Sequence, residues 1–441
     1  MKKSIGIVIC NYNKQDYIVN CIHSIFASTT EDFDLYVVDN ASTDQSVENI
    51  RNAFGNTVNL IINSNNLGGS GGFNTGIREV LKRDYEYLMC VDNDVVFDKN
   101  AVASLRYFLE QHPEVGMVGS RTFFMDDPER IWGFGGKIDF EKYLQNDYYK
   151  NCLEGEDVPE WIYCDYVPAC ALMTRVEVVR KVGIMPEENF IYWDDMEWGY
   201  RFNEAGYKVA AYGEAKVWHK GGGRNSQNTF IHYYMWRNRI NFFLKVLSEQ
   251  DREHFADTIL DEMFRMIYSV NLKGETNIVK TLMYAFDDAV HGVRGVATTG
   301  KVLPRFSVEN RVQKALEKWE SVIIRFNDDY EGIGNIIRNI MKIRPDIKIR
   351  ISIQNCKTNR ERMEYEYPGY QVTEEFSPGT DEFSLFMCSH IFSLTEDDES
   401  GNYIDSWCNI IFNEEDLMYA KNFKKAKELF ILCMKNLLMG I

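Results

Sequence analysis

Apolar and polar positions alternate along the first hundred residues in two different periods. Short continuous apolar runs predict buried parallel strands, because both faces of such strands are covered. Between these runs, apolar residues recur every three or four positions, as on one face of a helix. Strands are expected at 5–10, 35–38, 58–62 and 87–91, and helices at 15–26, 44–54 and 73–82. This alternation predicts an α/β domain with a mostly parallel, Rossmann-like sheet and helices on both faces.

The rest of the chain divides into further parts. Short strands are expected near 115–118, 165–173 and 216–218, and Gly221 to Gly223 have the composition of a flexible joint. Helical periodicity runs from 228 to about 290, before a linker-like segment at 292–304. Strand-like runs return at 322–326, 347–353, 383–394 and 408–412, and a helix follows over 415–438. We therefore predict three parts, at 1–225, 226–300 and 301–441: an α/β domain, a helical extension and a small C-terminal α/β domain.

The composition narrows the class of protein. Hydrophobic residues make up 45% and charged residues 26%, as in globular proteins. The formal net charge of −17 argues against a nucleic-acid-binding protein, whose affinity depends on Lys and Arg. Ten cysteines form no Cys-x-x-Cys pair, which favours reduced thiols and a cytoplasmic location over disulfides or a zinc site. The apolar run after Lys3 stops at Asn11, so we interpret it as a first strand and not as a signal peptide.

Three polar clusters follow predicted strands: Asn11-Tyr12-Asn13, Asp39-Asn40-Ala41-Ser42 and Asp92-Asn93-Asp94. Ligands of open α/β sheets bind beyond the carboxyl ends of the strands, so these clusters are expected to share one site. Asp92 and Asp94 would repel each other, and Mg²⁺ or Mn²⁺ would remove that repulsion. The alternative is a solvated turn, because Asp and Asn are common turn residues. For Asp39 the alternatives are a helix cap, a role better suited to Ser42, and hydrogen bonding to a uracil-like base or a ribose.

Glycines gather before the third predicted helix, in Asn66-Leu67-Gly68-Gly69-Ser70-Gly71-Gly72. Glycines let a backbone approach a phosphate closely and present its N–H groups at a helix N-terminus. The spacing is neither that of a P-loop nor that of a dinucleotide-binding fingerprint. The stretch therefore predicts either an unusual phosphate-binding loop or a merely flexible one.

A second acidic group lies in the segment Phe190 to Arg201. If a helix starts there, Asp194 at the N-cap and Glu197 form a capping-box-like pair. Asp195 then has no local structural role, and the flanking aromatic residues would desolvate it and raise its pKa, as a general base requires. His219 ends a later apolar strand, where its imidazole is either structural or a third ligand beside the two aspartates of the earlier cluster.

Taken in order, these motifs resemble the inverting GT-A glycosyltransferases of family 2, which move a sugar from a nucleotide-sugar to an acceptor hydroxyl. The resemblance covers roughly residues 3–245, about half of the chain. It implies a metal site of Asp92, Asp94 and His219 with Mn²⁺ or Mg²⁺ as cofactor, and Asp195 as the catalytic base. It implies donor contacts from Asn11, Asn13, Asp39, Asn66, Gly68, Gly69, Asp92 and Asn93.

On the acceptor side, the resemblance implies contacts from Trp193, Asp194 and Glu197. Residues 133–136 and 165–170 lie where the family builds its acceptor cleft, with Pro168 in place of an expected glycine. Arg201 or Arg237 would share the charge of the leaving diphosphate with the amides of the glycine-rich stretch.

Within the family, Gly-Gly-Ser-Gly-Gly-Phe-Asn together with Trp-Asp-Asp-x-Glu looks most like galactofuranosyltransferases and rhamnosyltransferases of bacterial surface polysaccharides. Those enzymes use UDP- or dTDP-sugars, so the expected partners are such a donor and a glycan or lipid-linked glycan acceptor. One alternative is a nucleotidyltransferase, which usually carries its glycine loop after the first strand. The other is a sugar-nucleotide-binding partner subunit without chemistry, against which the intact carboxylates and His219 argue.

For two regions of the chain, the sequence does not decide which partner they bind. The aromatic tract Phe230 to Phe243 carries two arginines, and we expect it to be buried against the catalytic domain. Its alternative is contact with a membrane or a lipid-linked acceptor, at the inner face of the plasma membrane. The resemblance does not extend to residues 305–441, and their sequence does not choose between binding acceptor, joining subunits into a homo-oligomer and contacting another enzyme.

Overall fold

The computed structural model describes residues 3–155, 157–221, 228–305 and 308–440. The chain forms two compact units, Met1–Ile259 with Lys280–Pro304, and Leu260–Val279 with Arg305–Ile441. The joint predicted at Gly221 to Gly223 continues into residues 222 and 223, which lie outside the described residues.

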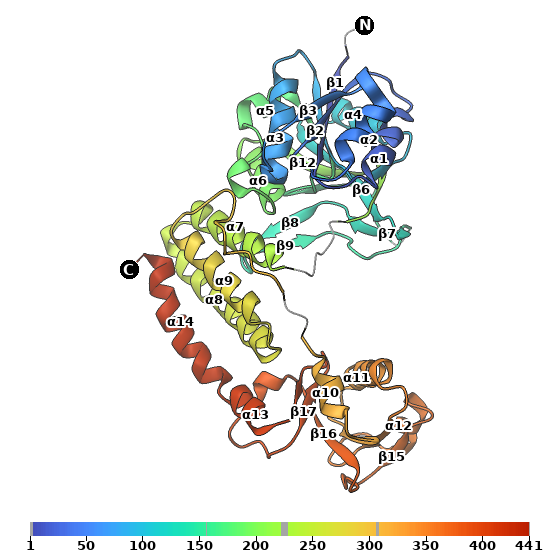
Figure 1. Cartoon of the computed structure of the whole chain (residues 1–441), viewed down its shortest axis with the longest axis vertical. Coiled ribbons are helices and arrows are strands. Elements are labelled where there is room, and N and C mark those ends of the chain that lie inside the picture. The colour runs from blue at the N-terminus through green and yellow to red at the C-terminus, as the bar shows by residue number, and fades with distance from the viewer. Residues whose placement is uncertain (1–2, 156, 222–227, 306–307, 441) are drawn as a thin grey trace. The chain divides into compact units, whose positions relative to one another are not determined.

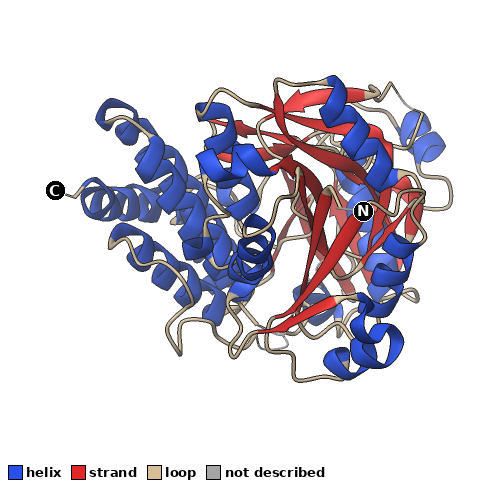
Figure 2. Cartoon of the chain, turned by 90° about the horizontal axis from the view of Figure 1, so that it is seen from above, coloured by secondary structure: helices blue, strands red, loops and turns tan. Residues whose placement is uncertain are grey.

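A large twisted sheet forms the centre of the first unit (Figures 1 and 2). Its strand order is β10-β12-β6-β11-β4-β1-β2-β3, with β5 paired to β12 and β7 paired to β6. The strands are β1 (Ile5–Asn11), β2 (Phe33–Asp39), β3 (Asn59–Ile62), β4 (Tyr87–Asp92), β5 (Val95–Phe97), β6 (Val115–Phe124), β7 (Asp127–Gly133), β10 (Trp161–Cys164), β11 (Ala171–Arg175) and β12 (Lys208–His219). Strands β8 (Gly136–Asp139) and β9 (Leu144–Asp147) form a separate hairpin.

Helices cover both faces of this sheet, as the alternating pattern predicts. The helices of the unit are α1 (Ile18–Phe26), α2 (Ser46–Phe54), α3 (Gly68–Leu81), α4 (Ala101–Gln111), α5 (Val176–Val182), α6 (Asp194–Glu204) and α7 (Phe230–Val246), with the short 3-10 turns η1 (Gly55–Thr57) and η2 (Glu187–Asn189). Helices α1, α2 and α4 pack with Ile7 in one core layer, and α3, α5 and α6 pack with Val8 in the other. Successive strand residues point to opposite faces, so both must be apolar.

The predicted α/β class is confirmed. Strands β3, β2, β1 and β4 are parallel, and the sheet continues through β11, which runs antiparallel to both β4 and β6. The carboxyl ends of β1, β2 and β4 therefore lie together at one edge of the sheet. This edge carries the three polar clusters that the sequence singled out.

Helix α3 begins at Gly68, earlier than the predicted start at Phe73. A Cβ atom on Gly72 would lie 2.3 Å from the Cys10 sulfur, and one on Gly76 would lie 2.4 Å from Val8 Cγ1. Glycine has a poor helix propensity. Here it is required because α3 packs so closely on β1 that no side chain fits between them.

The aromatic helix α7 is buried, which confirms the expectation for this tract. Tyr233 and Phe242 have no exposed surface, and the Phe242 ring lies 5.4 Å from that of Trp193 in the segment before α6. Among the residues that the structure describes, no helix has the length and apolarity needed to span a membrane.

The second unit contains its own, smaller α/β sheet, which confirms the predicted C-terminal α/β domain. Its strand order is β15-β14-β13-β16-β17-β18, parallel except for the last pair. The strands are β13 (Ser321–Arg325), β14 (Lys348–Ser352), β15 (Gln371–Thr373), β16 (Glu382–Cys388), β17 (Tyr403–Asp405) and β18 (Ile410–Ile411). The helices are α10 (Arg311–Leu316), α11 (Tyr330–Ile343), α12 (Arg360–Glu366), η3 (Ile391–Ser393), α13 (Glu414–Lys421) and α14 (Phe423–Met439).

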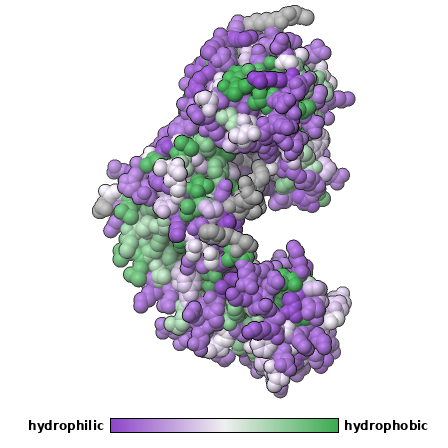
Figure 3. Space-filling model, in the orientation of Figure 1, coloured by the Kyte–Doolittle hydropathy of each residue, from purple (hydrophilic) through white to green (hydrophobic). Residues whose placement is uncertain are grey.

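Two long helices, α8 (Glu249–Leu272) and α9 (Thr276–Val290), each contribute residues to both units. Within the second unit, Phe264 and Tyr268 of α8 pack on Phe423 of α14. The face of the molecule in Figure 3 is largely hydrophilic and is interrupted by patches of apolar side chains. Helices α8 and α9 lie between the two sheets in the sequence, which confirms the predicted helical segment there.

Candidate functional site

The ends of β1, β2 and β4 are joined by a buried network of polar side chains. Asn11 lies opposite Asp39 in the parallel register, and its amide donates to the Asp39 carboxylate at 2.9 Å. The amide of Asn93 donates in turn to the Asn11 carbonyl oxygen at 2.9 Å. The exposed fractions of the three residues are 0%, 1% and 8%. The sheet therefore brings together residues from all three polar clusters.

Loops after β1 and β2 are tied by Ser42, which is not the helix cap that the sequence suggested. Helix α2 begins at Ser46, and the residue before it makes no side-chain cap. Instead, the Ser42 amide donates to Asp39 Oδ2 at 2.9 Å, and the Ser42 hydroxyl accepts from the Asn13 amide at 3.0 Å. Both carboxylate oxygens of Asp39 thus have partners within the protein. The contact of Asp39 and Asn13 with a nucleotide stays a prediction.

Asp92, Asp94 and His219 form one cluster, with a ligand atom from each residue within 4.8 Å of the others. His219 Nε2 lies 2.9 Å from Asp94 Oδ1 and 3.7 Å from Asp92 Oδ2. The antiparallel pairing of β12 with β5 places His219 opposite Val95, the residue after Asp94. This register explains how residues distant in sequence reach one site.

The cluster has the ligand types that a divalent cation such as Mn²⁺ or Mg²⁺ uses: carboxylate oxygens and an imidazole nitrogen. In the structure, positively charged Lys14 lies against it, with Nζ 2.7 Å from Asp94 Oδ2. Burial would raise the pKa of Asp94, but hydrogen bonds from His219 and Lys14 lower it to about 2. Burial raises the pKa of Asp92 to about 6, although His219 opposes the shift. One buried and one half-buried carboxylate, with cationic side chains drawn to them, fit a cation site.

Sequence reasoning missed Lys14 as a partner of this cluster. The available signal was its place directly after Asn13, at the end of the central strand. Its ammonium group already balances part of the negative charge at Asp94, so a metal would have to compete with it.

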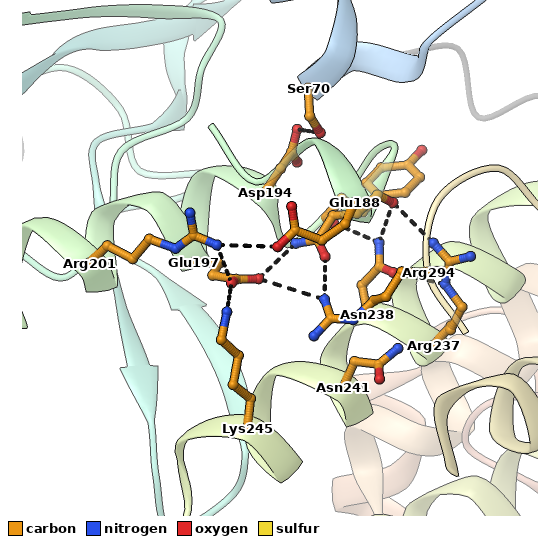
Figure 4. Close-up of polar contacts among 12 residues, drawn as sticks. Ser70, Glu188, Asp194, Glu197, Arg201, Arg237, Asn238, Asn241, Lys245 and Arg294 are labelled. Carbon is orange, nitrogen blue, oxygen red and sulfur yellow. Dashed lines mark hydrogen bonds and ion pairs between the residues drawn. The ribbon is translucent and has the colours of Figure 1, made fainter. Parts of the chain in front are cut away.

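Helix α6 carries the second acidic group, and its start differs from the expected one. The helix begins at Asp194, and Trp193 before it has a left-handed backbone with φ of 63°. Asp194 Oδ2 accepts a hydrogen bond from the Ser70 hydroxyl at 2.8 Å (Figure 4). The predicted capping box of Asp194 with Glu197 is therefore wrong, because Asp194 lies inside the first turn and its carboxylate faces α3.

Glu197 is the centre of an interior ion cluster (Figure 4). It is 2% exposed, and its Oε1 lies 2.8 Å from Arg201 and 2.7 Å from Lys245. The amide of Asn189 donates to its other oxygen at 3.0 Å. These contacts lower the pKa of Glu197 although burial acts in the opposite direction. The cluster fixes α6 against α7.

Asp195 is the carboxylate of this helix that lacks such partners. Its side chain is half-buried, and its Oδ1 accepts a hydrogen bond from the amide of the next residue, Met196, at 2.9 Å. Burial and then the charges of Asp194 and Asp147 raise the pKa of Asp195 to about 8. A carboxyl group with this pKa holds a proton more tightly than an ordinary one, as a general base must. The predicted direction of the shift and its cause agree with the structure.

Several predicted contacts lie in the interior instead. Trp193 has no exposed surface and packs against α7, so neither Trp193 nor Glu197 can touch an acceptor without rearrangement. Arg237 is fully buried, and its guanidinium donates to the carbonyl oxygens of Gly295 and Asn189 at 2.7 and 3.2 Å. Arg201 pairs with Glu197. Both arginines are already paired within the protein, and only Arg237 is fully buried, so their contact with a diphosphate stays a prediction.

The glycines at the start of α3 also have a structural reason. Gly68 has φ of +77°, and a Cβ atom there would lie 2.0 Å from the Phe190 carbonyl oxygen. The Gly68 amide donates to Asn66 Oδ1 at 2.8 Å, and the Ser70 amide donates to the Phe190 oxygen at 3.3 Å. Two of the amides expected to meet a phosphate are thus engaged. Donor contacts of Asn66, Gly68 and Gly69 stay predictions.

The segments expected to form the acceptor cleft lie side by side. Gly136 donates from its amide to the Tyr166 carbonyl oxygen at 3.1 Å, and Asp165 donates to the Gly136 oxygen at 2.8 Å. The Tyr166 hydroxyl donates to Asp147 Oδ1 at 2.7 Å. Burial and then Asp147 raise the pKa of Tyr166, and the charge of Asp195 adds a smaller contribution. Tyr166 and Asp147 therefore lie near Asp195, which the sequence did not reveal.

Comparison with known proteins places this geometry in a family. Residues 6–180 match the sequence profile of glycosyl transferase family 2. An uncharacterized glycosyltransferase of Haemophilus influenzae is 21% identical over 310 residues, which cover 64% of this chain and 92% of that protein.

Two longer relatives match a smaller share of the chain, which in turn spans less than a third of their length. The galactofuranosyltransferase GlfT2 of Mycolicibacterium smegmatis is 24% identical over 197 residues, covering 41% of this chain and 30% of that protein. The teichoic acid poly(glycerol phosphate) polymerase of Staphylococcus epidermidis is 26% identical over 195 residues, covering 42% and 23%. The matched family region holds β1 to β4, the Asp92 and Asp94 carboxylates and the glycine-rich helix. Residues 6–180 thus match glycosyl transferase family 2, and this match together with the glycosyltransferase relatives supports a glycosyltransferase.

Proposed function

We propose that the first unit transfers a sugar from a UDP- or dTDP-sugar to a hydroxyl group of a glycan or lipid-linked glycan, in a metal-dependent reaction that inverts the anomeric carbon. The observation that carries this proposal is the separation of two acidic groups. Asp92, Asp94 and His219 form a cluster suited to a cation, and Asp195 is a half-buried carboxyl group outside it with a raised pKa. Burial chiefly raises the pKa of Asp92, and the charges of Asp94 and then Asp194 add to the shift, so the cluster and the start of α6 interact electrostatically. Direct displacement requires charge neutralisation and a base on different residues.

The family and its relatives support the choice of donor. The galactofuranosyltransferase and the teichoic acid polymerase each match about two fifths of the chain, over 197 and 195 residues. We therefore favour galactofuranose or rhamnose as the sugar and bacterial surface polysaccharide synthesis as the setting. The buried network of Asn11, Asp39 and Asn93 would form the floor of the donor site, at the carboxyl ends of the strands. All ten cysteines are free, which supports a cytoplasmic location.

In the proposed reaction, Asp195 accepts the proton of the acceptor hydroxyl as the O–H bond breaks. The acceptor oxygen forms a bond to the anomeric carbon from the face opposite the leaving group. The bond between that carbon and the diphosphate oxygen breaks, and its electron pair leaves with the nucleoside diphosphate. The configuration at the anomeric carbon is therefore inverted.

Asp92, Asp94 and His219 would hold the cation. A divalent ion bound there supplies charge neutralisation for the departing diphosphate. Lys14, which pairs with Asp94 in the structure, lies close enough to add a positive charge on the same side. Asp147 lies near Asp195, is held by the hydroxyl of the buried Tyr166 and is suited to orienting the acceptor hydroxyl.

A donor screen tests the proposal. The full chain is heated with Mn²⁺ and each of several UDP- and dTDP-sugars. Binding at 100 times the dissociation constant should stabilise the protein by about 2.7 kcal/mol. The donor that stabilises is then incubated with candidate glycan acceptors, and NMR of the product reports its anomeric configuration.

Two variants sharpen the test. Asp94→Ala should abolish the dependence of UDP affinity on Mn²⁺, as measured by calorimetry, and unchanged affinity would refute the metal site. Asp195→Asn should keep donor binding but lose turnover, because an amide cannot accept the proton. A folded Asp195→Asn protein with most of its turnover, or a product with retained configuration, would sink the proposed mechanism.

A further inference from the structure

The segment that leads into α6 has an unusual backbone. Phe190, Tyr192 and Trp193 have φ values of 68°, 63° and 63°. Residues other than glycine rarely adopt this left-handed region, and each instance is strained and persists only where the surroundings impose it. The strained segment ends directly at Asp194 and Asp195. The contacts that hold this segment therefore also hold Asp195, the proposed base.

Three hydrogen bonds from one side chain of α7, Asn238, hold this segment (Figure 4). The amide nitrogen of Asn238 donates to the carbonyl oxygens of Asn189, Ile191 and Tyr192 at 2.9, 2.8 and 3.0 Å. Asn238 has no exposed surface. Its amide nitrogen carries two hydrogens, so the three carbonyl groups share them.

The remaining carbonyl groups of the segment accept hydrogen bonds from backbone amides of α3 and α6. The Phe190 oxygen accepts from the Ser70 amide at 3.3 Å, and the Trp193 oxygen accepts from the Glu197 amide at 3.0 Å. Asn238 is therefore the side chain that holds the middle of the segment. Buried carbonyl groups left without a donor would favour another backbone conformation.

Asn238 is itself held in one orientation. Its Oδ1 accepts a hydrogen bond from Arg237 Nε at 3.0 Å, and Arg237 also donates to the Asn189 carbonyl oxygen at 3.2 Å. This contact fixes which end of the Asn238 amide is the acceptor, so its NH₂ group must face the strained segment. Arg294 adds a hydrogen bond at 2.7 Å to the Asn189 side chain.

We propose that Asn238 is a positioning residue that keeps the left-handed turn at 190–193 in place and thereby fixes the Asp195 carboxylate for catalysis. The inference rests on the proposed function for its catalytic part only. Its structural part concerns the segment and can be measured in the absence of any sugar. A displacement of about 1 Å at a catalytic group costs on the order of 100-fold in rate.

The test compares Asn238→Ala with Asn241→Ala. Asn241 is a buried asparagine of the same helix, but its amide donates to the Val293 carbonyl oxygen at 3.5 Å and not to the segment. In hydrogen–deuterium exchange, Asn238→Ala should speed exchange of the amides at 190–197, and Asn241→Ala should leave them protected. In kinetics, Asn238→Ala should lower kcat about 100-fold with a change of less than about threefold in the KM for the donor.

The pH profile separates positioning from general loss of stability. In Asn238→Ala the ascending limb of kcat should move to lower pH, because a loosened Asp195 is more hydrated and its pKa falls towards the ordinary range. Asn238→Asp keeps the acceptor for Arg237 but removes the donor, so it should behave like the alanine variant.

Three outcomes would overturn the inference: unchanged exchange at 190–197, a kcat equal to that of Asn241→Ala, or an unmoved pH profile. If the wild-type protein transfers no sugar from any UDP- or dTDP-sugar, the proposed function fails. The exchange comparison then still decides whether Asn238 holds the segment.

Discussion

Ser70 donates its hydroxyl hydrogen to the Asp194 carboxylate at 2.8 Å, although 124 residues separate them in the chain. This bond joins α3, the glycine-rich helix, to α6, which carries the proposed base. Burial raises the pKa of Asp194, and the bond from Ser70 opposes that shift. The two helices that flank the site are thus coupled through one hydrogen bond.

Removal of the hydroxyl should destabilise the first unit. In Ser70→Ala the buried Asp194 carboxylate loses its side-chain donor, at a cost of about 1–3 kcal/mol. Urea unfolding measures the loss. Ser64→Ala is the control, because Ser64 is exposed in the loop before α3. Equal stability of the two variants would show that the bond contributes nothing.

Activity should rise with pH. Asp195 accepts a proton only when it is deprotonated, and its pKa is raised to about 8, so kcat/KM should increase as the pH approaches and passes that value. The titratable groups near it are Asp194, Asp147, Tyr166 and Cys170. The measurement is a rate profile from about pH 5 to about pH 9 at saturating Mn²⁺. A flat profile across that range would contradict the assignment of Asp195.

Two neighbouring glycines should respond very differently to alanine. Gly68→Ala places a methyl group 2.0 Å from the Phe190 oxygen at a position with φ of +77°, so it should strongly destabilise the protein or prevent folding. Gly69→Ala meets its nearest atom at 3.9 Å and should be tolerated, with a gain of up to about 1 kcal/mol from helix propensity. Soluble yield and melting temperature compare them. If both variants were equally stable, the close approach of α3 to the 190–193 segment would be disproved.

Metal affinity should increase when Lys14 is removed. Its ammonium group lies 2.7 Å from Asp94 Oδ2, so a cation must compete with it. Lys14→Met keeps most of the side-chain volume without the charge, and we expect Mn²⁺ to bind about tenfold more tightly, a change of about 1.4 kcal/mol. Calorimetry without donor measures it. Lys3→Met is the control, since Lys3 bonds to the backbone of Glu31. Weaker or equal Mn²⁺ binding by Lys14→Met would contradict competition.

Local sequence patterns sufficed for the fold class and for the main acidic groups. Continuous apolar runs identified β1, β2 and β4, because strands with two covered faces must be apolar throughout. The polar residues that end them, such as Asn11 and Asp39, stood out because such residues interrupt an apolar run only where a strand ends. Asp195 was singled out for a different reason, as a carboxylate of a predicted helix with no local structural role.

Contacts between distant segments decided the rest. The glycines of α3 suggested a phosphate loop, but Gly72 and Gly76 are required by the packing of the helix on β1. Arg237 suggested a diphosphate contact, yet it is buried against Asn189 and Gly295. The composition of a segment shows that it contains small or charged residues. Only their contacts in the folded protein show which role each residue has.

The sequence by itself determined the α/β class, the glycosyltransferase resemblance and the acidic residues, because these depend on periodicity and on residue types at strand ends. The tertiary structure alone decided that Lys14 pairs with Asp94, that Ser70 holds Asp194 and that Asn238 supports the turn before Asp195. The physical reason is that each of these hydrogen bonds joins segments far apart in the chain. Their partners are fixed by sheet register and helix packing, which no local pattern encodes.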